Sequence, residues 1–340
     1  MKPIFLLFIV VAGIQAANAQ DTPDKFGPKE ENYTLRVTAR LLTEDGQPLE
    51  NADVHVAIEN FNDFKDDSND IRGKTDKDGK FSAEGVGRPQ AIIIASHEGY
   101  YWSRKAYGTW DKFEEARKTG RYVPWDPVIE LTLKKVGKPI PMIVRIGGEL
   151  RSYGIAPAVD MDLEWDLMKA DWRPPYGQGK QADLILNFQS SFVDRGNNSA
   201  KMKMRFANKN DGLIAIEKLS GEESALKFPR EAPKDGYAMK DYVTSIQVKD
   251  ATSVEEQPEK KPVGYFIRFR SVVNEAGEVV SANYGKITTP IGISPPALRE
   301  PHPSFSFESY INPTAGDRNL EYDQHNNLAP EATQGVVMAP

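Results

Sequence analysis

The sequence predicts an all-β fold made of two antiparallel β-sandwich domains, and three observations lead to this prediction. Apolar residues recur at every second position through much of the chain, as strands with one buried face require. Turn-forming pairs such as Asp-Gly, together with prolines, separate these stretches at short intervals. Almost no stretch follows the 3.6-residue period of an amphipathic helix.

The first 19 residues are predicted to be a cleavable signal peptide of bacterial type. Lys2 precedes the apolar run 4–12, and Ala17-Asn18-Ala19 matches the small-residue pattern of a cleavage site, so we place cleavage after Ala19. The run is shorter than the roughly 20 residues that a spanning helix needs, and no later stretch qualifies. We therefore expect a periplasmic, secreted or cell-surface protein without a membrane span after cleavage.

Composition narrows the choice of partners. The 340 residues include no cysteine, so the fold relies on its hydrophobic core and not on disulfides. A net charge of −6 argues against nucleic acid as a partner. The length suits two ordinary domains.

The first domain is expected after a flexible leader over residues 20–32. Strands with one polar face are predicted where apolar residues alternate, at 35–41 and 54–58, with a turn over 43–48 between them. A second turn lies at 75–81. Further strands are predicted at 91–95 and 128–133, and residues 110–119, inside an aromatic-rich insertion, are expected to form a short exposed helix.

Three of these segments carry a resemblance: Asp45 to Val54, Thr75 to Phe81, and Glu98-Gly99-Tyr100. Together they resemble a carboxypeptidase regulatory-like domain over residues 33–135. The resemblance implies a transthyretin-like or immunoglobulin-like β-sandwich. It also implies an accessory, spacer or adhesion role without catalytic residues. The loop 60–73 and the insertion after Tyr100 depart from the compact form of such domains.

Residues 136–141 are predicted to be a linker, because two prolines and a glycine interrupt both helix and strand. A second domain is expected over 142–328, a larger sandwich or a jelly roll, and it resembles only uncharacterised secreted bacterial proteins. Within it, residues 310–323 are expected to form an ordered loop packed back on the sandwich. Residues 329–340 are expected to be a disordered tail.

No familiar catalytic or metal motif occurs in the sequence. The histidines, His55, His97, His302 and His325, form no metal-binding spacing, and there is no Gly-x-Ser-x-Gly. Residues 76–79 lack the acidic ligands of a calcium loop and are interpreted as a hairpin turn. No cofactor is therefore expected.

A group of three acids leaves a hydrolase possible. Asp162, Glu164 and Asp166 alternate along one predicted strand and would share its solvent face. Two carboxylates that flank a cleft could hydrolyse a glycoside. Ordinary solubility explains the same pattern, and we favour that interpretation.

Aromatic residues form the most specific candidate site. Their rings could stack on sugar rings, although burial within the sandwich or between the domains is the favoured alternative. The candidate ligand-binding residues are Tyr101, Trp102, Tyr107, Trp110, Trp172 and Tyr176.

The sequence thus predicts an exported, non-enzymatic cell-envelope protein that acts as a structural, adhesion or binding module. The alternative is a carbohydrate-binding protein that uses its loop aromatics, and a third hypothesis is an unrecognised hydrolase in the second domain. The partners considered are a polysaccharide and another envelope protein.

Overall fold

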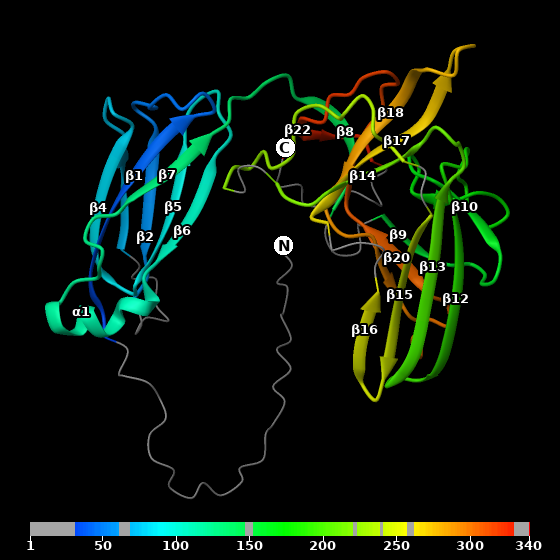
Figure 1. Cartoon of the computed structure of the whole chain (residues 1–340), viewed down its shortest axis with the longest axis horizontal. Helices are drawn as coiled ribbons and strands as arrows, with labels where there is room; N and C mark the ends of the chain where they lie inside the picture. Colours follow the sequence, from blue (N-terminus) through cyan, green and yellow to red (C-terminus); the bar gives the residue numbers. More distant parts are fainter. Residues whose placement is uncertain are drawn as a thin grey trace, which may run out of the picture.

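The chain forms two β domains that lie side by side and are joined by one connection (Figure 1). The computed structural model describes residues 31–60, 69–146, 152–219, 223–238, 241–256, 262–329 and 340. The predicted signal peptide with Ala19, and the leader up to residue 30, lie outside the described residues.

The first domain is a sandwich of two sheets, with strand orders β4-β1-β7 and β3-β2-β5-β6. The bounds are β1 (Tyr33–Thr43), β2 (Asp53–Ile58), β3 (Asn69–Lys74), β4 (Lys80–Gly87), β5 (Gln90–Ser96), β6 (Ser103–Gly108) and β7 (Val128–Leu133). The core between the sheets contains the alternating apolar side chains that the sequence predicts, including Leu35, Val37, Ala39, Leu41, Val54, Val56 and Ile58.

The predicted hairpin over residues 75–81 is instead a tight turn that leads from one sheet to the other, because β3 pairs with β2 and β4 pairs with β1. The Asp76 carboxylate accepts hydrogen bonds from the amides of Asp78 at 2.9 Å and Lys80 at 2.8 Å. Gly79 has a φ of +73°, and a Cβ there would lie 2.5 Å from the carbonyl oxygen of Leu41. The acid therefore closes the turn by an Asx interaction, and the glycine is required by both φ and space.

The insertion contains the predicted helix, as the 3-10 turn η1 (Trp110–Lys112) followed by α1 (Phe113–Thr119). Gly120, at φ +73°, ends α1 by donating to the carbonyl of Ala116 at 2.7 Å. The chain then enters β7, which pairs with β1 in parallel over residues 38–43 and 128–133. This parallel pair differs from the antiparallel pairing expected throughout.

The second domain is a larger sandwich. Its sheets have the orders β11-β10-β12-β13-β15-β16, β14-β17-β18-β21-β8-β22 and β19-β20-β9. The bounds are β8 (Ile140–Arg145), β9 (Ser152–Ile155), β10 (Asp162–Asp166), β11 (Asp171–Trp172), β12 (Leu184–Asp194), β13 (Asn197–Phe206), β14 (Gly212–Ile216), β15 (Tyr242–Lys249), β16 (Thr252–Glu256), β17 (Gly264–Val273), β18 (Val279–Ile287), β19 (Gly292–Ser294), β20 (Ser304–Phe307), β21 (Ser309–Asn312) and β22 (Tyr322–Asn327). All-β sandwich architecture is thus confirmed.

Asp166 does not lie on the solvent face of its strand, as the sequence predicted. Asp162 and Glu164 are exposed, but only 1% of Asp166 is exposed. Because β10 ends at Asp166, its carboxylate turns inward and accepts from the amides of Met168 at 2.9 Å and Lys169 at 3.0 Å. The three acids therefore do not form one surface cluster.

Arg270 connects this carboxylate to the other sheet. It lies in a bulge of β17 at φ +56°, and its guanidinium is 2.9 Å from Asp166 Oδ1 and 2.8 Å from Asp183 Oδ1. Burial acts to raise the pKa of Asp166, but amide hydrogen bonds and Arg270 outweigh it, so the pKa is lowered. For Asp183 burial prevails, and its pKa is raised.

The ends of the second domain are tightly packed. β8 begins at Ile140, inside the segment predicted as a linker, and the predicted terminal loop is ordered, with Leu320 and Tyr322 buried. Of the predicted disordered tail, residues 330–339 lie outside the described residues, whereas Ala329 and Pro340 are buried. Within the described segments, no helix is both long and apolar enough to cross a membrane.

Candidate functional site

The predicted aromatic residues divide into buried and exposed groups. Tyr101 is 7% exposed and Trp172 is 6% exposed, so burial, the favoured alternative, applies to both. Tyr107 is half-buried against the first core. The exposed aromatics of the prediction are Trp102 (43%), Trp110 (52%) and Tyr176 (45%).

The exposed aromatics do not form one platform. Trp102 precedes β6 and Trp110 follows it, so the length of the strand, about 20 Å at 3.3 Å per residue, separates them. Tyr176 belongs to the second domain. Trp172 packs edge-to-face on Trp165, with ring centroids 4.9 Å apart, and its indole donates to the carbonyl of Ile155. Residues that cluster in the sequence are therefore dispersed in the structure.

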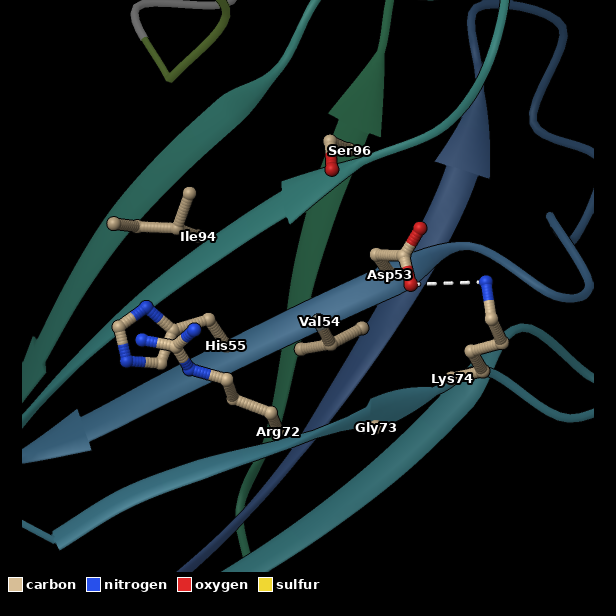
Figure 2. A pocket seen from close by; sticks show the side chains of 8 residues that line it. All are labelled: Asp53, Val54, His55, Arg72, Gly73, Lys74, Ile94 and Ser96. Atoms are coloured by element: carbon tan, nitrogen blue, oxygen red, sulfur yellow. Dashed lines mark ion pairs between the residues drawn. The ribbon is translucent and has the colours of Figure 1, made fainter.

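A groove of about 510 Å³ crosses the outer face of the sheet β3-β2-β5-β6 (Figure 2). Its floor is made by β2, β3 and β5, and His55, Arg72 and Ile94 lie on these three neighbouring strands. His55 occupies the outer face because Val54 and Val56 on either side of it point into the core. The predicted solvent-facing position of His55 is confirmed.

The charges of this groove are paired with one another. Lys74 Nζ lies 2.9 Å from Asp53 Oδ1. A dashed line marks this ion pair in Figure 2. Asp70 contacts two of these side chains. Its Oδ1 lies 2.9 Å from His55 Nε2, and its Oδ2 lies 3.5 Å from Arg72 Nη2. No cluster of three metal-ligating side chains occurs among the described residues. The groove is thus an open, polar surface with balanced charge.

A more specific arrangement occurs where the two domains meet, and Glu321 is its centre. Only 1% of Glu321 is exposed. Its Oε1 accepts from the Tyr101 hydroxyl and from the amide of Gly137, both at 2.7 Å, and its Oε2 accepts from the amide of Lys138 at 2.9 Å. One carboxylate therefore holds the first domain, the connection and the second domain together. We call this contact the junction.

Burial has a direct electrostatic effect at the junction. Desolvation, and then the hydrogen bond to Glu321, raise the pKa of Tyr101 far above its ordinary value. Tyr101 consequently remains a hydrogen-bond donor throughout the neutral range.

A charged pair and an apolar contact flank Glu321. The guanidinium of Arg230 forms two hydrogen bonds to Glu44, at 3.0 and 2.9 Å, and this partner lowers the pKa of Glu44. Tyr101 packs against Ala225 and Leu226 of the second domain. Polar and apolar contacts thus occur together, as in stable interfaces between domains.

Main-chain hydrogen bonds extend the junction along β6. Ala225 donates to the carbonyl of Trp102 at 2.9 Å, and Arg104 donates to the carbonyl of Glu223 at 2.8 Å. The segment 223–225 therefore covers the first residues of β6, which is an edge strand. An exposed edge is protected in this way from pairing with other chains.

The sequence patterns did not indicate the junction residues Glu321, Arg230 and Glu44. The ordered loop 310–323 was expected, but nothing in it assigned a role to Glu321. The signal was a glutamate between Leu320 and Tyr322, two residues that are buried. The position of Gly137 requires a residue without a side chain, because a Cβ there would lie 2.5 Å from Glu321 Oε2.

No protein-family profile matches the sequence, and no curated protein matches it either. The resemblance to a carboxypeptidase regulatory-like domain thus rests on its motifs, while the sandwich that it implies is present.

Three solved structures illustrate the similarity. A mercury-inhibited catechol 1,2-dioxygenase from Acinetobacter sp. ADP1 is 16% identical over 34% of this chain, at a TM-score of 0.23, and this chain spans only 56% of it. The shaft pilin SpaA of Lactobacillus rhamnosus GG is 12% identical over 80% of this chain and 93% of its own, at 0.22. A DUF3823 family protein of Parabacteroides merdae is 8% identical over 82% and 99%, at 0.19. None of these scores supports an argument about activity.

Proposed function

We propose that this protein is a structural module of the cell envelope, in which two sandwich domains are held at a fixed relative orientation to act as a scaffold, spacer or adhesion unit. The observation that carries the proposal is the junction at Glu321. The N-terminal sequence, with its predicted cleavage after Ala19, supports export.

The contacts at Glu321 explain why the orientation would be fixed. Domain rotation would remove the buried carboxylate from three donors, and a hydrogen bond to a charged group contributes about 1.5–3 kcal/mol. The same rotation would also separate Arg230 from Glu44. A spacer or adhesion unit needs such rigidity, whereas a hinge-bending enzyme needs a mobile connection.

The distance between the domains tests this proposal. The sequence has no cysteine, so Val86→Cys and Val193→Cys place one spin label on each domain, at residues that are 51% and 78% exposed. Electron–electron double resonance on the full mature chain should give one narrow distance distribution. A broad or multimodal distribution would contradict a fixed orientation.

Export is tested separately. N-terminal sequencing of protein recovered from the medium and from the periplasmic fraction should give Gln20 as the first residue. An intact Met1 would overturn the envelope location, whatever the distance measurement shows.

A second candidate function is carbohydrate binding, and the exposure of Trp102 and Trp110 favours it. A glycan array should compare the mature protein with Trp102→Ala, Trp110→Ala and Tyr176→Ala. Trp172 is unsuitable because it is a core residue. Binding that one substitution abolishes would locate the site, and binding to no glycan would reject this candidate.

A further inference from the structure

Lys286 lies in a cavity inside the second domain. It belongs to β18, and only 1% of the residue is exposed. The cavity has a volume of about 260 Å³, and its lining includes Lys227, Phe228, Glu308, Tyr310 and Pro340. This volume is slightly smaller than the roughly 300–1,000 Å³ of ligand pockets, so the cavity suits only a small molecule.

The ammonium of Lys286 lies among aromatic rings. Its Nζ is 4.7 Å from the ring centroid of Tyr310 and 5.6 Å from that of Phe228. Burial lowers the pKa of Lys286 to about 7, and the negative charge of Glu321 offsets only part of this effect. The surrounding protein thus compensates the positive charge incompletely, and a bound anion would complete the compensation.

An oxygen acceptor already occupies the position that such an anion would take. Lys286 Nζ donates to the main-chain oxygen of Pro340 at 2.9 Å. Pro340, Phe228 and Tyr310 all line this cavity. The structure therefore shows an oxygen acceptor on Lys286 Nζ, with the apolar rings of Phe228 and Tyr310 close to the same nitrogen.

We propose that this cavity binds a small organic carboxylate, with one carboxylate oxygen accepting a hydrogen bond from Lys286 Nζ and the hydrocarbon part lying against Phe228 and Tyr310. Lys227, at the exposed rim, adds a second positive charge, and Glu308 is the acidic residue of the lining, so two cations face one carboxylate. Pro340 and a free carboxylate compete for the site.

The probe for this proposal is N-acetyl-L-proline, which reproduces the proline ring and a carboxylate. N-acetyl-L-prolinamide, its neutral counterpart, is the matched control. Binding is followed on the full chain by the ¹³Cε resonance of Lys286, titrated with pH. Pro340 belongs to the same chain and competes at about millimolar effective concentration, so the titration extends to about 50 mM probe.

Pro340→Lys removes this competition, because a second cation cannot be buried beside Lys286. In this variant we expect N-acetyl-L-proline to bind at least about tenfold more tightly than the amide, as a charge-assisted hydrogen bond predicts. Binding of a carboxylate should also shift the titration of Lys286 to higher pH, because the bound anion stabilises the ammonium.

Lys286→Met provides the second arm, with Lys227→Met as the control at the rim. The first substitution should abolish the preference for the acid over the amide, and the second should retain most of it. The proposal is overturned if the Lys286 resonance of Pro340→Lys does not move with N-acetyl-L-proline. It is equally overturned if acid and amide bind alike, or if folded Lys286→Met keeps the preference.

Discussion

At the residue scale, buried ionisable groups distinguish this protein from a plain sandwich, and Glu321, Asp166 and Lys286 are three of them. Each is at most 1% exposed. Glu321 and Asp166 accept hydrogen bonds from main-chain amides, which supply the polar environment that burial removes. Lys286 has the main-chain oxygen of Pro340 and two rings instead, and of the three groups its charge is compensated least.

Tyr101→Phe tests the importance of the Glu321 contact. The substitution removes one donor from a buried carboxylate, so the free energy of unfolding should fall by about 1.5–3 kcal/mol in urea titrations. Tyr176→Phe is the control, because Tyr176 is 45% exposed and its loss should matter by less than about 0.5 kcal/mol. Equal effects of the two substitutions would refute the role of the hydroxyl.

Lys286 predicts a pH dependence of stability. Its pKa is lowered from 10.5 to about 7 in the folded state, so above pH 7 the unfolded chain binds the extra proton. The stability of the wild type should therefore rise relative to Lys286→Met between pH 7 and 9, by up to about 1.4 kcal/mol per pH unit. Urea titrations at both pH values measure this. If the stability of the wild type and of Lys286→Met changed equally with pH, a lowered pKa of Lys286 would be excluded. Lys227→Met is the control, and its stability should change with pH as that of the wild type does.

At the element scale, the bulge of β17 has the clearest role. It directs Arg270 toward Asp166 and Asp183, so that an irregular strand links the two large sheets. In a regular strand, side chains point alternately to the two faces of the sheet, and the direction of Arg270 would follow from that of its neighbours. The left-handed φ of Arg270 is therefore balanced by two ion pairs.

Arg270→Met should destabilise the second domain by about 3–5 kcal/mol at pH 7, because two buried carboxylates lose their cation. Burial already raises the pKa of Asp183, so part of the loss should be recovered as the pH falls and this acid takes up a proton. Arg205→Met breaks an exposed pair with Asp162 and should change the stability by about 1 kcal/mol or less. Calorimetry at pH 5 and 7 measures the loss of stability of Arg270→Met relative to the wild type. A larger loss at pH 5 than at pH 7 would contradict this prediction.

Alternation along the strands made β1, β2 and β7 predictable, because the residues that decide their faces are neighbours in sequence. The turn at Asp76 was predictable for the same reason, although the two strands that it connects pair in different sheets and form no hairpin. Asp166 and Glu321 were not, since the groups that make their burial favourable lie far away in the chain. Aromatic clustering misled for a related reason: Trp102 and Trp110 are close in sequence but lie at opposite ends of β6.

At the scale of the whole molecule, the junction determines how the two sandwiches act together. The connection carries no slack, because the amides of Gly137 and Lys138 bind the same carboxylate. The domains also share main-chain hydrogen bonds along β6. Loss of one contact should therefore loosen the whole arrangement before either domain unfolds.

Gly137→Ala tests this directly. The added Cβ would approach Glu321 Oε2 to 2.5 Å, so the spin-label distance distribution should broaden while both domains stay folded. In Gly292→Ala the new Cβ meets nothing closer than 3.6 Å, and the distribution should stay narrow. A narrow distribution in Gly137→Ala would show that the junction does not depend on this close approach.

The parallel pairing of β1 with β7 has a mechanical consequence. Tension that enters at the start of β1 and leaves through the end of β7 pulls the two strands past each other lengthwise. The hydrogen bonds between residues 38–43 and 128–133 would then carry the load together and not open one after another. Stretched between two anchoring points, the first domain should yield at a higher force than a hairpin peeled from its end.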